Sequence, residues 1–449
     1  MKNINIIGSG LSGPLLATLI AQNSNLKINM FERSQDLRNS NNFSGRSINL
    51  ALSKRGINAL KNAELFDSDF KSELIPMYGR AIHDINGKQS IQMYGNKKSH
   101  YINSVSRASM NKILLNAAEK TKKVSINFDM KCSELNLNKN EVIFNENKIF
   151  NFDGPVIGAD GYRSKVSKAI SEIKNSKLNY VDIEHSYKEL TIKPKNNEYQ
   201  LDPNYLHIWP RRDLMIIALP NTDKSFTCTL FMKTKGDQSF QSIKDKNDLY
   251  SFFETNFVDL IDLIDNFENE FFNNPTGKLV GLKVPHWSYE DKALVIGDAA
   301  HATVPFYGQG MNAAFEDCYI LSKIINENKR FDWGEIFDFF SKKRKIDADS
   351  ILDLSLINYK VMRNDVLDEK FIKKQKLSFM LNEDFPNQFI PVYTMVSFTN
   401  IPYNIALIRS EIQDKILDNL LLKLNSIDDY NKHLCSDIIN KELSIINAD

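Results

Sequence analysis

Residues 4–13 read Ile-Asn-Ile-Ile-Gly-Ser-Gly-Leu-Ser-Gly, and this stretch decides the fold. An apolar strand leads into three glycines, Gly8, Gly10 and Gly13, and a helix-forming run from Pro14 to Gln22 follows. Glycines at this spacing permit a tight turn and the close approach of a pyrophosphate to the N-terminus of the helix. The sequence therefore predicts that the chain begins with a βαβ dinucleotide-binding unit.

The second strand of this unit ends at Phe31, and Glu32 and Arg33 follow it. In dinucleotide-binding units an acidic residue about 20 residues after the glycines holds a ribose hydroxyl. The strand, the helix and the acid all fall at the expected places. This agreement strengthens the prediction, because the glycine pattern alone also occurs in turns that serve only packing.

A second informative stretch, residues 296–317, reads Ile-Gly-Asp-Ala-Ala-His-Ala-Thr-Val-Pro-Phe-Tyr-Gly-Gln-Gly-Met-Asn-Ala-Ala-Phe-Glu-Asp. An apolar strand runs into Gly297 and Asp298, a glycine-containing loop follows, and a helix is predicted to begin near Met311. A carboxylate in this position can hold a sugar-alcohol hydroxyl. The helix N-terminus offers backbone N–H groups and the positive end of the helix dipole to an anionic or electron-rich ring.

A third motif, Val156–Val166, carries Asp160 and Gly161 between an apolar strand and a helix. Taken in isolation, this is a strand-to-helix turn with an aspartate that caps the helix.

The composition of the chain excludes several classes of protein. The 449 residues are 42% hydrophobic and 25% charged with a net charge of +1, so no basic excess indicates nucleic-acid binding. The four cysteines are scattered without metal-ligand spacing, which predicts a reduced protein without a metal site. No run approaches the roughly 20 apolar residues of a membrane span.

The order of predicted elements indicates an inserted sheet. Four strands are expected between about residues 180 and 235, which we interpret as an antiparallel sheet that interrupts the nucleotide-binding unit. Helices are expected over residues 107–120 and 247–272. From about residue 333 onward the chain is predicted to be mostly helical, with a loop over residues 385–391.

In this order, the three motifs resemble those of the FAD-dependent aromatic hydroxylases, the group A flavoprotein monooxygenases. The resemblance implies an α/β fold: a Rossmann-like FAD-binding domain of the p-hydroxybenzoate hydroxylase type, an inserted antiparallel β-sheet substrate domain and a C-terminal helical region. The expected boundaries are 1–74, 106–178 and 275–330 for the FAD-binding domain, 75–105 and 179–274 for the substrate domain, and 331–449 for the helical region.

Five further stretches narrow the resemblance to the kynurenine-hydroxylating branch of this family, over essentially the whole chain. They are Gly45–Gly56, Pro76–His83, Ser104–Arg107 with the Asn-x-x-Leu-Leu helix that follows, Asn358–Arg363 and Phe389–Val396. This branch implies hydroxylation of L-kynurenine with O2 through a flavin hydroperoxide. Because the chain has a single dinucleotide fingerprint, FAD is expected to be tightly bound, whereas NADPH binds transiently.

The resemblance also assigns residues, and none of them is a catalytic side chain, because the flavin carries the chemistry. The expected FAD contacts are Gly8, Gly10, Leu11, Ser12, Gly13, Glu32, Arg33, Ala51, Arg107, Asp160, Asp298, Gly310, Met311 and Asn312. The expected substrate contacts are Arg80, Tyr94, Phe231, Phe306, Gln309, Asn358, Met362 and Tyr393. His301 and His83 are interpreted as structural.

The chemistry of these residue types suits kynurenine, which carries an amino-acid head and an aminophenyl ketone. Arg80 offers a planar fork to a carboxylate, and Tyr94, Asn358 and Tyr393 can hydrogen-bond to it. Phe306 and Met362 offer apolar, polarisable contacts to the ring.

Three alternatives stay open at this point: a flavin hydroxylase of a phenolic acid, a flavin-dependent reductase of the same fold, and a flavin-binding protein without turnover. The Asp- and Asn-rich end of the chain is unlike the membrane-anchoring segment of mitochondrial relatives and predicts a soluble bacterial form in the cytoplasm. Monomer and homodimer are equally compatible with the sequence.

Overall fold

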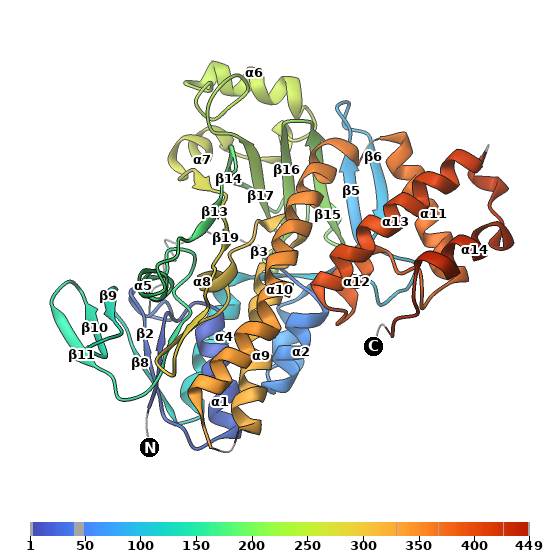
Figure 1. The fold of residues 1–449 in the computed structure, drawn as a ribbon. Coiled ribbons are helices and arrows are strands. Elements are labelled where there is room, and N and C mark those ends of the chain that lie inside the picture. The colour runs from blue at the N-terminus through green and yellow to red at the C-terminus, as the bar shows by residue number, and fades with distance from the viewer. Residues whose placement is uncertain (1–2, 40–48, 329, 367, 425, 448–449) are drawn as a thin grey trace. The chain divides into compact units, whose positions relative to one another are not determined.

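A computed structural model describes residues 3–39, 49–328, 330–366, 368–424 and 426–447 (Figure 1). The predicted motif residues Gly45 to Ile48 lie outside the described residues. The chain divides into two compact units, each assembled from three segments. Unit 1 comprises Met1–Leu74, Val105–Ile183 and Val280–Leu352, and unit 2 comprises Ile75–Ser104, Glu184–Leu279 and Asp353–Asp449. The three-part domain division expected from the family resemblance stays a prediction.

Unit 1 is built on a six-stranded sheet in the order β20-β21-β12-β1-β2-β8. Neighbouring strands pair in parallel, except that β20 runs antiparallel to β21. The strands are β1 (Ile4–Ile7), β2 (Ile28–Phe31), β8 (Val124–Asn127), β12 (Val156–Gly158), β20 (Ser288–Tyr289) and β21 (Ala293–Val295). All residues of β1, β12 and β21 are buried, as expected for a parallel sheet with covered faces.

The helices of unit 1 come from all three of its segments. They are α1 (Ser12–Asn23), α2 (Lys54–Asn62), α3 (Ser68–Ser72), α4 (Arg107–Lys120), α5 (Lys165–Ile173), α8 (Asp298–His301), α9 (Gly310–Glu327) and α10 (Trp333–Lys360), of which α10 belongs to unit 1 up to Leu352. The predicted helices at 14–22 and 107–120 are confirmed as α1 and α4.

Further strands complete unit 1. They are β3 (Asn49–Leu52), the antiparallel set β9 (Cys132–Asn136), β10 (Glu141–Phe144) and β11 (Lys148–Asn151), and the antiparallel pair β13 (Asn179–Val181) and β19 (Gly281–Lys283).

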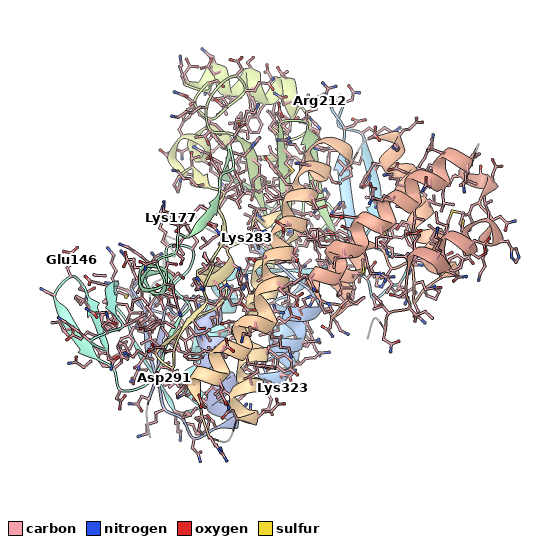
Figure 2. All side chains as sticks on the ribbon, viewed as in Figure 1. Glu146, Lys177, Arg212, Lys283, Asp291 and Lys323 are labelled. Atoms are coloured by element: carbon pink, nitrogen blue, oxygen red, sulfur yellow. The ribbon has the colours of Figure 1, made fainter. Side chains whose placement is uncertain are left out.

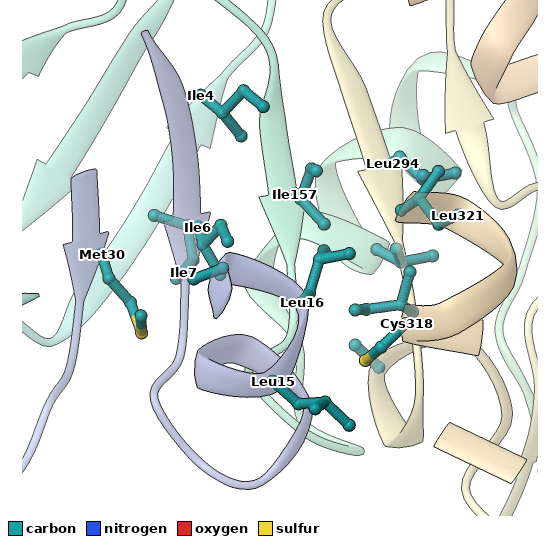
Figure 3. Close-up of a cluster of buried hydrophobic side chains, with 14 of the residues drawn as sticks. Ile4, Ile6, Ile7, Leu15, Leu16, Met30, Ile157, Leu294, Cys318 and Leu321 are labelled. Atoms are coloured by element: carbon teal, nitrogen blue, oxygen red, sulfur yellow. The ribbon is translucent and has the colours of Figure 1, made fainter. Parts of the chain in front are cut away.

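The core of unit 1 lies between the central strands and the helices α1 and α9. Figure 3 shows Ile6 of β1, Leu16 of α1, Ile157 of β12 and Leu321 of α9 gathered in this layer. The helices α1 and α9 also pack on each other. Glu146 and Lys323, labelled in Figure 2, are instead exposed.

Unit 2 contains a seven-stranded sheet in the order β18-β14-β17-β16-β15-β5-β6. The strands are β5 (Gly79–His83), β6 (Gln89–Met93), β14 (His185–Ile192), β15 (Tyr205–Arg211), β16 (Leu214–Pro220), β17 (Phe226–Lys233) and β18 (Gly277–Lys278). Separately, β4 (Ile75–Met77) pairs with β7 (Ile102–Ser106) in antiparallel fashion.

The four strands predicted between residues 180 and 235 are confirmed as β14 to β17, and they pair antiparallel to one another. The sheet as a whole is mixed, however, because β15 pairs in parallel with β5. The β5 strand precedes β15 by more than one hundred residues in the sequence, so the pattern within either strand could not reveal this pairing.

The predicted continuous helical segment over 247–272 is wrong in its middle. Two helices, α6 (Lys246–Asn256) and α7 (Phe267–Asn273), flank a non-helical stretch that contains a short 3-10 turn, Ile261–Leu263. The break has a local cause: Asn266, which precedes α7, has a left-handed backbone with φ of 56°. The apolar residues of both helices pack with Trp209, Ile216 and Leu230 of the sheet.

The end of the chain is helical, as predicted. A π-helical turn, Val361–Asp365, follows α10 and precedes α11 (Glu369–Asp384), α12 (Val392–Phe398), α13 (Tyr403–Lys423), a 3-10 turn (Ile427–Asp429) and α14 (Lys432–Glu442). The helices α11, α13 and α14 share one apolar cluster. Among the helices that the structure describes, none combines the length and the apolar character needed to cross a bilayer.

The position of Ile157 in the core generates a stability prediction. Replacing fully buried Ile157 by alanine removes apolar contacts and leaves a cavity, so we expect the free energy of unfolding to fall by about 2–5 kcal/mol. Urea denaturation followed by circular dichroism measures this change. The matched control is Ile149→Ala on strand β11, where the side chain is 59% exposed. An equal loss in both variants would contradict the assignment of β12 to the core.

Candidate active site

The sequence motifs of unit 1 meet at the carboxyl edge of its parallel sheet. Gly8 follows β1, Glu32 follows β2, and Asp160 lies two residues beyond β12, after Ala159. Asp298 lies beyond the end of β21, after Ile296 and Gly297. Because these four strands run in the same direction, their carboxyl ends share one edge, where open α/β sheets bind ligands. The strand β1 lies between β2 and β12, so the direction of the strand order reverses there.

The three glycines of the first turn serve three different needs. Gly8 has a φ of 103°, and a Cβ there would lie 2.4 Å from the carbonyl oxygen of Ala159. A Cβ on Gly13 would lie 2.1 Å from the carbonyl oxygen of Gly8, so this glycine lets α1 pack closely on the strand. A Cβ on Gly10, by contrast, would meet nothing within 4 Å. The turn is therefore tight on its inner side and open at Gly10, as a pyrophosphate site requires.

The helices α1 and α9 begin without a side-chain cap, although both follow motif loops. Other helices of unit 1 have such caps, since Ser106 accepts from Ser109 N–H at α4 and Ser164 accepts from Ser167 N–H at α5. Uncapped helix N-termini present backbone N–H groups and a positive dipole to an anion. These two helix ends, with open Gly10, fit the pyrophosphate and ring of FAD.

Glu32 is fixed by the glycine turn itself. One carboxylate oxygen accepts the backbone N–H of Ser9 at 2.8 Å and the Ser9 hydroxyl at 3.1 Å, while the other accepts the Ser34 N–H at 2.9 Å. These bonds orient the acid at the end of β2, where the sequence predicts contact with a ribose. Arg33 and Arg107, also predicted to contact FAD, have exposed side chains at the end of β2 and at the start of α4.

Sequence reasoning missed a residue that holds this turn from outside. The Asn111 side-chain amide on α4 donates to the carbonyl oxygens of Ser9 and Gly10, at 2.9 and 2.6 Å. The signal was present, because Asn111 is the asparagine of the Asn-x-x-Leu-Leu pattern. A pattern that reads as an ordinary helix, however, does not indicate what an individual side chain bonds.

The side chain of Asn312 is committed within the protein. It accepts the Ser53 N–H at 2.8 Å and donates to the carbonyl oxygens of Ala51 and Gly308, each at 2.8 Å. Asn312 therefore ties the strand that contains Ala51 to the loop before α9. The predicted contacts of Ala51, Gly310, Met311 and Asn312 with FAD stay predictions. Because the side chain of Asn312 is used in these hydrogen bonds, its backbone is the part suited to contact FAD.

The carboxylate of Asp160 accepts the Lys165 N–H at 2.8 Å near the start of α5, which is the helix-capping role that the motif indicates in isolation. Its other oxygen is buried and has no hydrogen-bond partner among the described residues. Burial raises the pKa of this carboxyl group, against the hydrogen bonds that lower it. Asp298, in contrast, is exposed at the start of α8, so its carboxylate is accessible to a ligand.

In unit 2 the structure brings three of the predicted substrate residues into direct contact. The rings of Tyr94 and Tyr393 stack with centroids 4.8 Å apart and an interplanar angle of 11°. The Arg80 guanidinium carbon lies 5.7 Å from the Tyr94 ring centroid and 5.2 Å from that of Tyr393. Arg80 comes from β5, Tyr94 directly follows β6, and Tyr393 lies on α12. We call these three residues the arginine–tyrosine cluster.

The charge of Arg80 is uncompensated. Arg80 and Tyr94 are only 7% and 5% exposed, and no acidic side chain forms an ion pair with Arg80 among the residues that the structure describes. Its buried Nε also has no hydrogen-bond partner there. Burial raises the pKa of both tyrosine hydroxyls, so they remain protonated donors at neutral pH. A buried guanidinium beside two protonated tyrosines favours an anionic ligand.

Three more predicted substrate residues belong to unit 2. Strand register places Phe231 on the same face of the sheet as Arg80. Arg80 pairs with Leu206 of β15, and Ile208, two residues later, points to the same face. Ile208 pairs with Ile217, which pairs with Thr229, and Phe231 lies two residues after Thr229 on β17. Asn358 lies near the end of α10, and Met362 lies one turn later in the π-helical turn that packs on β15. Phe306 and Gln309 belong to unit 1, in the buried loop before α9.

The two histidines interpreted as structural have defined partners. His83 Nδ1 lies 2.7 Å from Asp259 Oδ2, and its Nε2 lies 3.0 Å from His207 Nδ1, on the sheet face opposite Arg80. The Trp209 indole also donates to Asp259 Oδ2, at 2.9 Å. His301 Nε2 lies 2.5 Å from Asp317 Oδ2 in unit 1. Both rings are buried and engaged with carboxylates.

This chain resembles known proteins over most of its length. The FAD binding domain family matches residues 1–353. The kynurenine 3-monooxygenase of Cytophaga hutchinsonii is 40% identical over 94% of this chain and 94% of its own length. That of Anopheles gambiae is 40% identical over 93% of this chain and 86% of its own length.

Solved structures share the fold at low identity. A 2-methyl-3-hydroxypyridine-5-carboxylic acid oxygenase aligns with a TM-score of 0.65 and 18% identity, covering 82% of this chain and 94% of that one. PqsL of P. aeruginosa, in complex with 2-aminobenzoylacetate, aligns with a TM-score of 0.64 and 14% identity, covering 81% of this chain and 97% of that one. At such identities these structures support the predicted α/β fold alone.

The role of Asn111 gives a binding prediction. Asn111→Ala removes two hydrogen bonds that fix the glycine turn, each worth about 1 kcal/mol, so the dissociation constant of FAD should rise roughly 5- to 30-fold. Fluorescence titration with FAD measures this change. The matched control is Asn116→Ala on the same helix, where the side chain is exposed and contacts Arg38. Unchanged affinity in Asn111→Ala would remove this residue from the site.

Proposed function

The chain belongs to the family of kynurenine 3-monooxygenases, and on this premise we propose that its arginine–tyrosine cluster binds the amino-acid head of L-kynurenine. The protein is an FAD-dependent monooxygenase that hydroxylates L-kynurenine to 3-hydroxy-L-kynurenine with NADPH and O2. The observation that carries the site proposal is the buried, uncompensated guanidinium of Arg80 against two stacked tyrosines.

The geometry supports a carboxylate at Arg80 for a physical reason. A buried cation without a counter-ion loses much of its hydration, and a substrate carboxylate restores a charge-assisted, bidentate interaction. The hydroxyls of Tyr94 and Tyr393 can donate to the same carboxylate, since both remain protonated at neutral pH. Both rings lie within cation–π distance of the guanidinium, which favours a fork held in place before the substrate arrives.

The other roles follow from the surroundings of each residue. We assign FAD binding to the carboxyl edge of the sheet in unit 1, with Glu32 for the ribose, Gly10 and the start of α1 for the pyrophosphate, and Asp298 for the ribityl chain. When bound, FAD accepts electrons from NADPH and activates O2 for insertion into the substrate ring. Met362 and Phe231 are proposed as apolar walls of the kynurenine site, and Asn358 as a further polar contact. Phe306 and Gln309 stay predictions of the family resemblance.

The side chains of the protein contribute by positioning the substrate and by excluding water from the site, more than by transferring protons. The ring amine of kynurenine donates electron density to the carbon beside it, so the substrate needs no side-chain base to become nucleophilic. Consistent with this, the two histidines within the predicted motifs each have one ring nitrogen against a carboxylate, Nδ1 of His83 and Nε2 of His301. Exclusion of water from the site favours hydroxylation over the release of hydrogen peroxide. The cytoplasmic location stays a prediction.

Product identification tests the function. Purified protein with FAD, NADPH and O2 should convert L-kynurenine to 3-hydroxy-L-kynurenine, with oxygen uptake equal to product formed. Stimulation of NADPH oxidation by p-hydroxybenzoate but not by L-kynurenine would indicate a phenolic-acid hydroxylase instead. Formation of product without oxygen would indicate a reductase. Bound FAD without substrate-dependent NADPH oxidation would indicate a flavin-binding protein without turnover.

Removing the guanidinium tests the substrate site. Arg80→Ala should raise KM for L-kynurenine roughly 10- to 150-fold, because a charge-assisted hydrogen bond contributes about 1.5–3 kcal/mol. FAD content should stay unchanged. The matched control is Arg212→Ala, an exposed arginine of the same unit that is labelled in Figure 2.

A substrate analogue makes this test specific. Kynuramine, which is kynurenine without its carboxylate, should bind the unaltered protein more weakly than kynurenine does. In Arg80→Ala the two substrates should have similar KM values, because the group that distinguishes them has lost its partner. If Arg80→Ala weakened both substrates by the same factor, or released FAD, the assignment of Arg80 to the carboxylate would be wrong.

A further inference from the structure

The turn that presents Asp298 has a backbone conformation that needs external support. Gly297, which precedes it, has φ of 56° and ψ of −142°. A Cβ at Gly297 would lie 2.9 Å from the Ser12 hydroxyl oxygen and 3.1 Å from Ala314 Cβ. Only glycine adopts such a conformation readily, and glycine also has the largest conformational freedom to lose. The turn is therefore held by contacts made to its backbone.

One of these contacts comes from a buried carboxylate. Asp317 on α9 is fully buried and accepts the Gly297 N–H at 3.1 Å through Oδ2. The same oxygen lies 2.5 Å from Nε2 of His301, at the end of the four-residue helix that Asp298 begins. Because an ionised carboxylate can only accept, His301 Nε2 donates this hydrogen bond to Asp317. Asp317 thus holds both ends of the segment 297–301.

Arg344 holds Asp317 in turn. Its Nε donates to Asp317 Oδ1 at 2.9 Å from helix α10, and its side chain is only 2% exposed. The same guanidinium forms an ion pair with Glu316 at 2.9 Å, and Glu316 forms another with Arg55 of α2. Burial alone raises the pKa of Asp317, but His301 and Arg344 more than offset this and keep it ionised, with its pKa below its ordinary range.

A buried ion pair of this kind contributes little net stability, because both charges lose their hydration on folding. Two desolvated charges often stabilise a protein no more than well-packed apolar residues of the same volume. What a carboxylate with three N–H donors provides, and an apolar residue does not, is a fixed direction for each donor. Here one of the donors is the backbone of the turn that carries Asp298.

We propose that Arg344 and Asp317 are positioning residues for FAD, which hold the Gly297–Asp298 turn in the geometry that presents the Asp298 carboxylate to the cofactor. The inference rests on the proposed contact between Asp298 and FAD and extends it to two buried residues that act on the turn. Without the Asp317 carboxylate the chain still contains Asp298, but the turn that carries it is no longer held in one conformation. The affinity for FAD therefore falls.

The test compares isosteric substitutions of two aspartates that both form ion pairs with the Arg344 guanidinium. Asp317→Asn keeps the shape but offers N–H groups where the turn requires an acceptor. Asp347→Asn is the matched control, since Asp347 lies 3.5 Å from Arg344 Nη1 and is not among the groups that bond the turn. In a dilution series of the full-length holoenzyme, with released FAD followed by its fluorescence, Asp317→Asn should raise the dissociation constant at least tenfold. Asp347→Asn should stay within about twofold of the unaltered protein.

A purely structural role predicts a different result. In that case Asp317→Asn would lower the thermal midpoint while the dissociation constant, measured well below that midpoint, would stay the same, and the proposal would be overturned. If Asp317→Asn yields no folded protein, Arg344→Lys provides the comparison, since it keeps the charge and loses the Nε donor; an unchanged dissociation constant there would equally overturn the proposal. Absence of FAD from the unaltered protein would instead refute the proposed function.

Discussion

Parallel pairing of β1 with β2 on one side and with β12 on the other is the constraint on which unit 1 depends. Parallel strands deliver their carboxyl ends to a single edge, so motifs far apart in the sequence lie along the same border of the sheet. This pairing requires helices to return the chain, and α1 can return it closely only because Gly13 has no side chain. The geometry of the cofactor site is thus a consequence of strand direction and of one missing Cβ.

Polar side chains then fix what the sheet brings together. The side chains of Glu32, Asn111 and Asn312 form hydrogen bonds with backbone groups of the motif loops. Asp317 does the same for the turn at Gly297. Loops that approach a ligand cannot be stabilised by regular secondary structure, and their backbone groups need partners from elsewhere in the fold. In unit 1, Glu32 provides such a partner from the end of β2, Asn111 from α4, and Asn312 and Asp317 from α9. The two helices therefore orient the loops as well as covering the sheet.

In unit 2, by contrast, the Arg80 guanidinium is buried without an acidic partner among the residues that the structure describes. Arg80 lies on one face of the seven-stranded sheet, while the opposite face at the same strand satisfies its buried polar groups through His83, His207 and Asp259. An alternating strand can serve both purposes, because successive side chains point to opposite faces. The uncompensated face is suited to a ligand and the compensated face to packing with α6 and α7.

The sequence by itself determined the α/β fold, the first βαβ unit, helix α4 and the loop before α9, because glycine spacing and apolar periodicity are local properties of the chain. It also determined the family, since the motifs occur in a fixed order. Only the tertiary structure decided that β5 joins β15 in parallel, that the helical segment before residue 272 is broken, and that Asn111 and Asp317 hold the loops. The break has a local cause at Asn266, but the other features depend on hydrogen bonds between residues distant in sequence, and no local pattern encodes which donor a buried acceptor will meet.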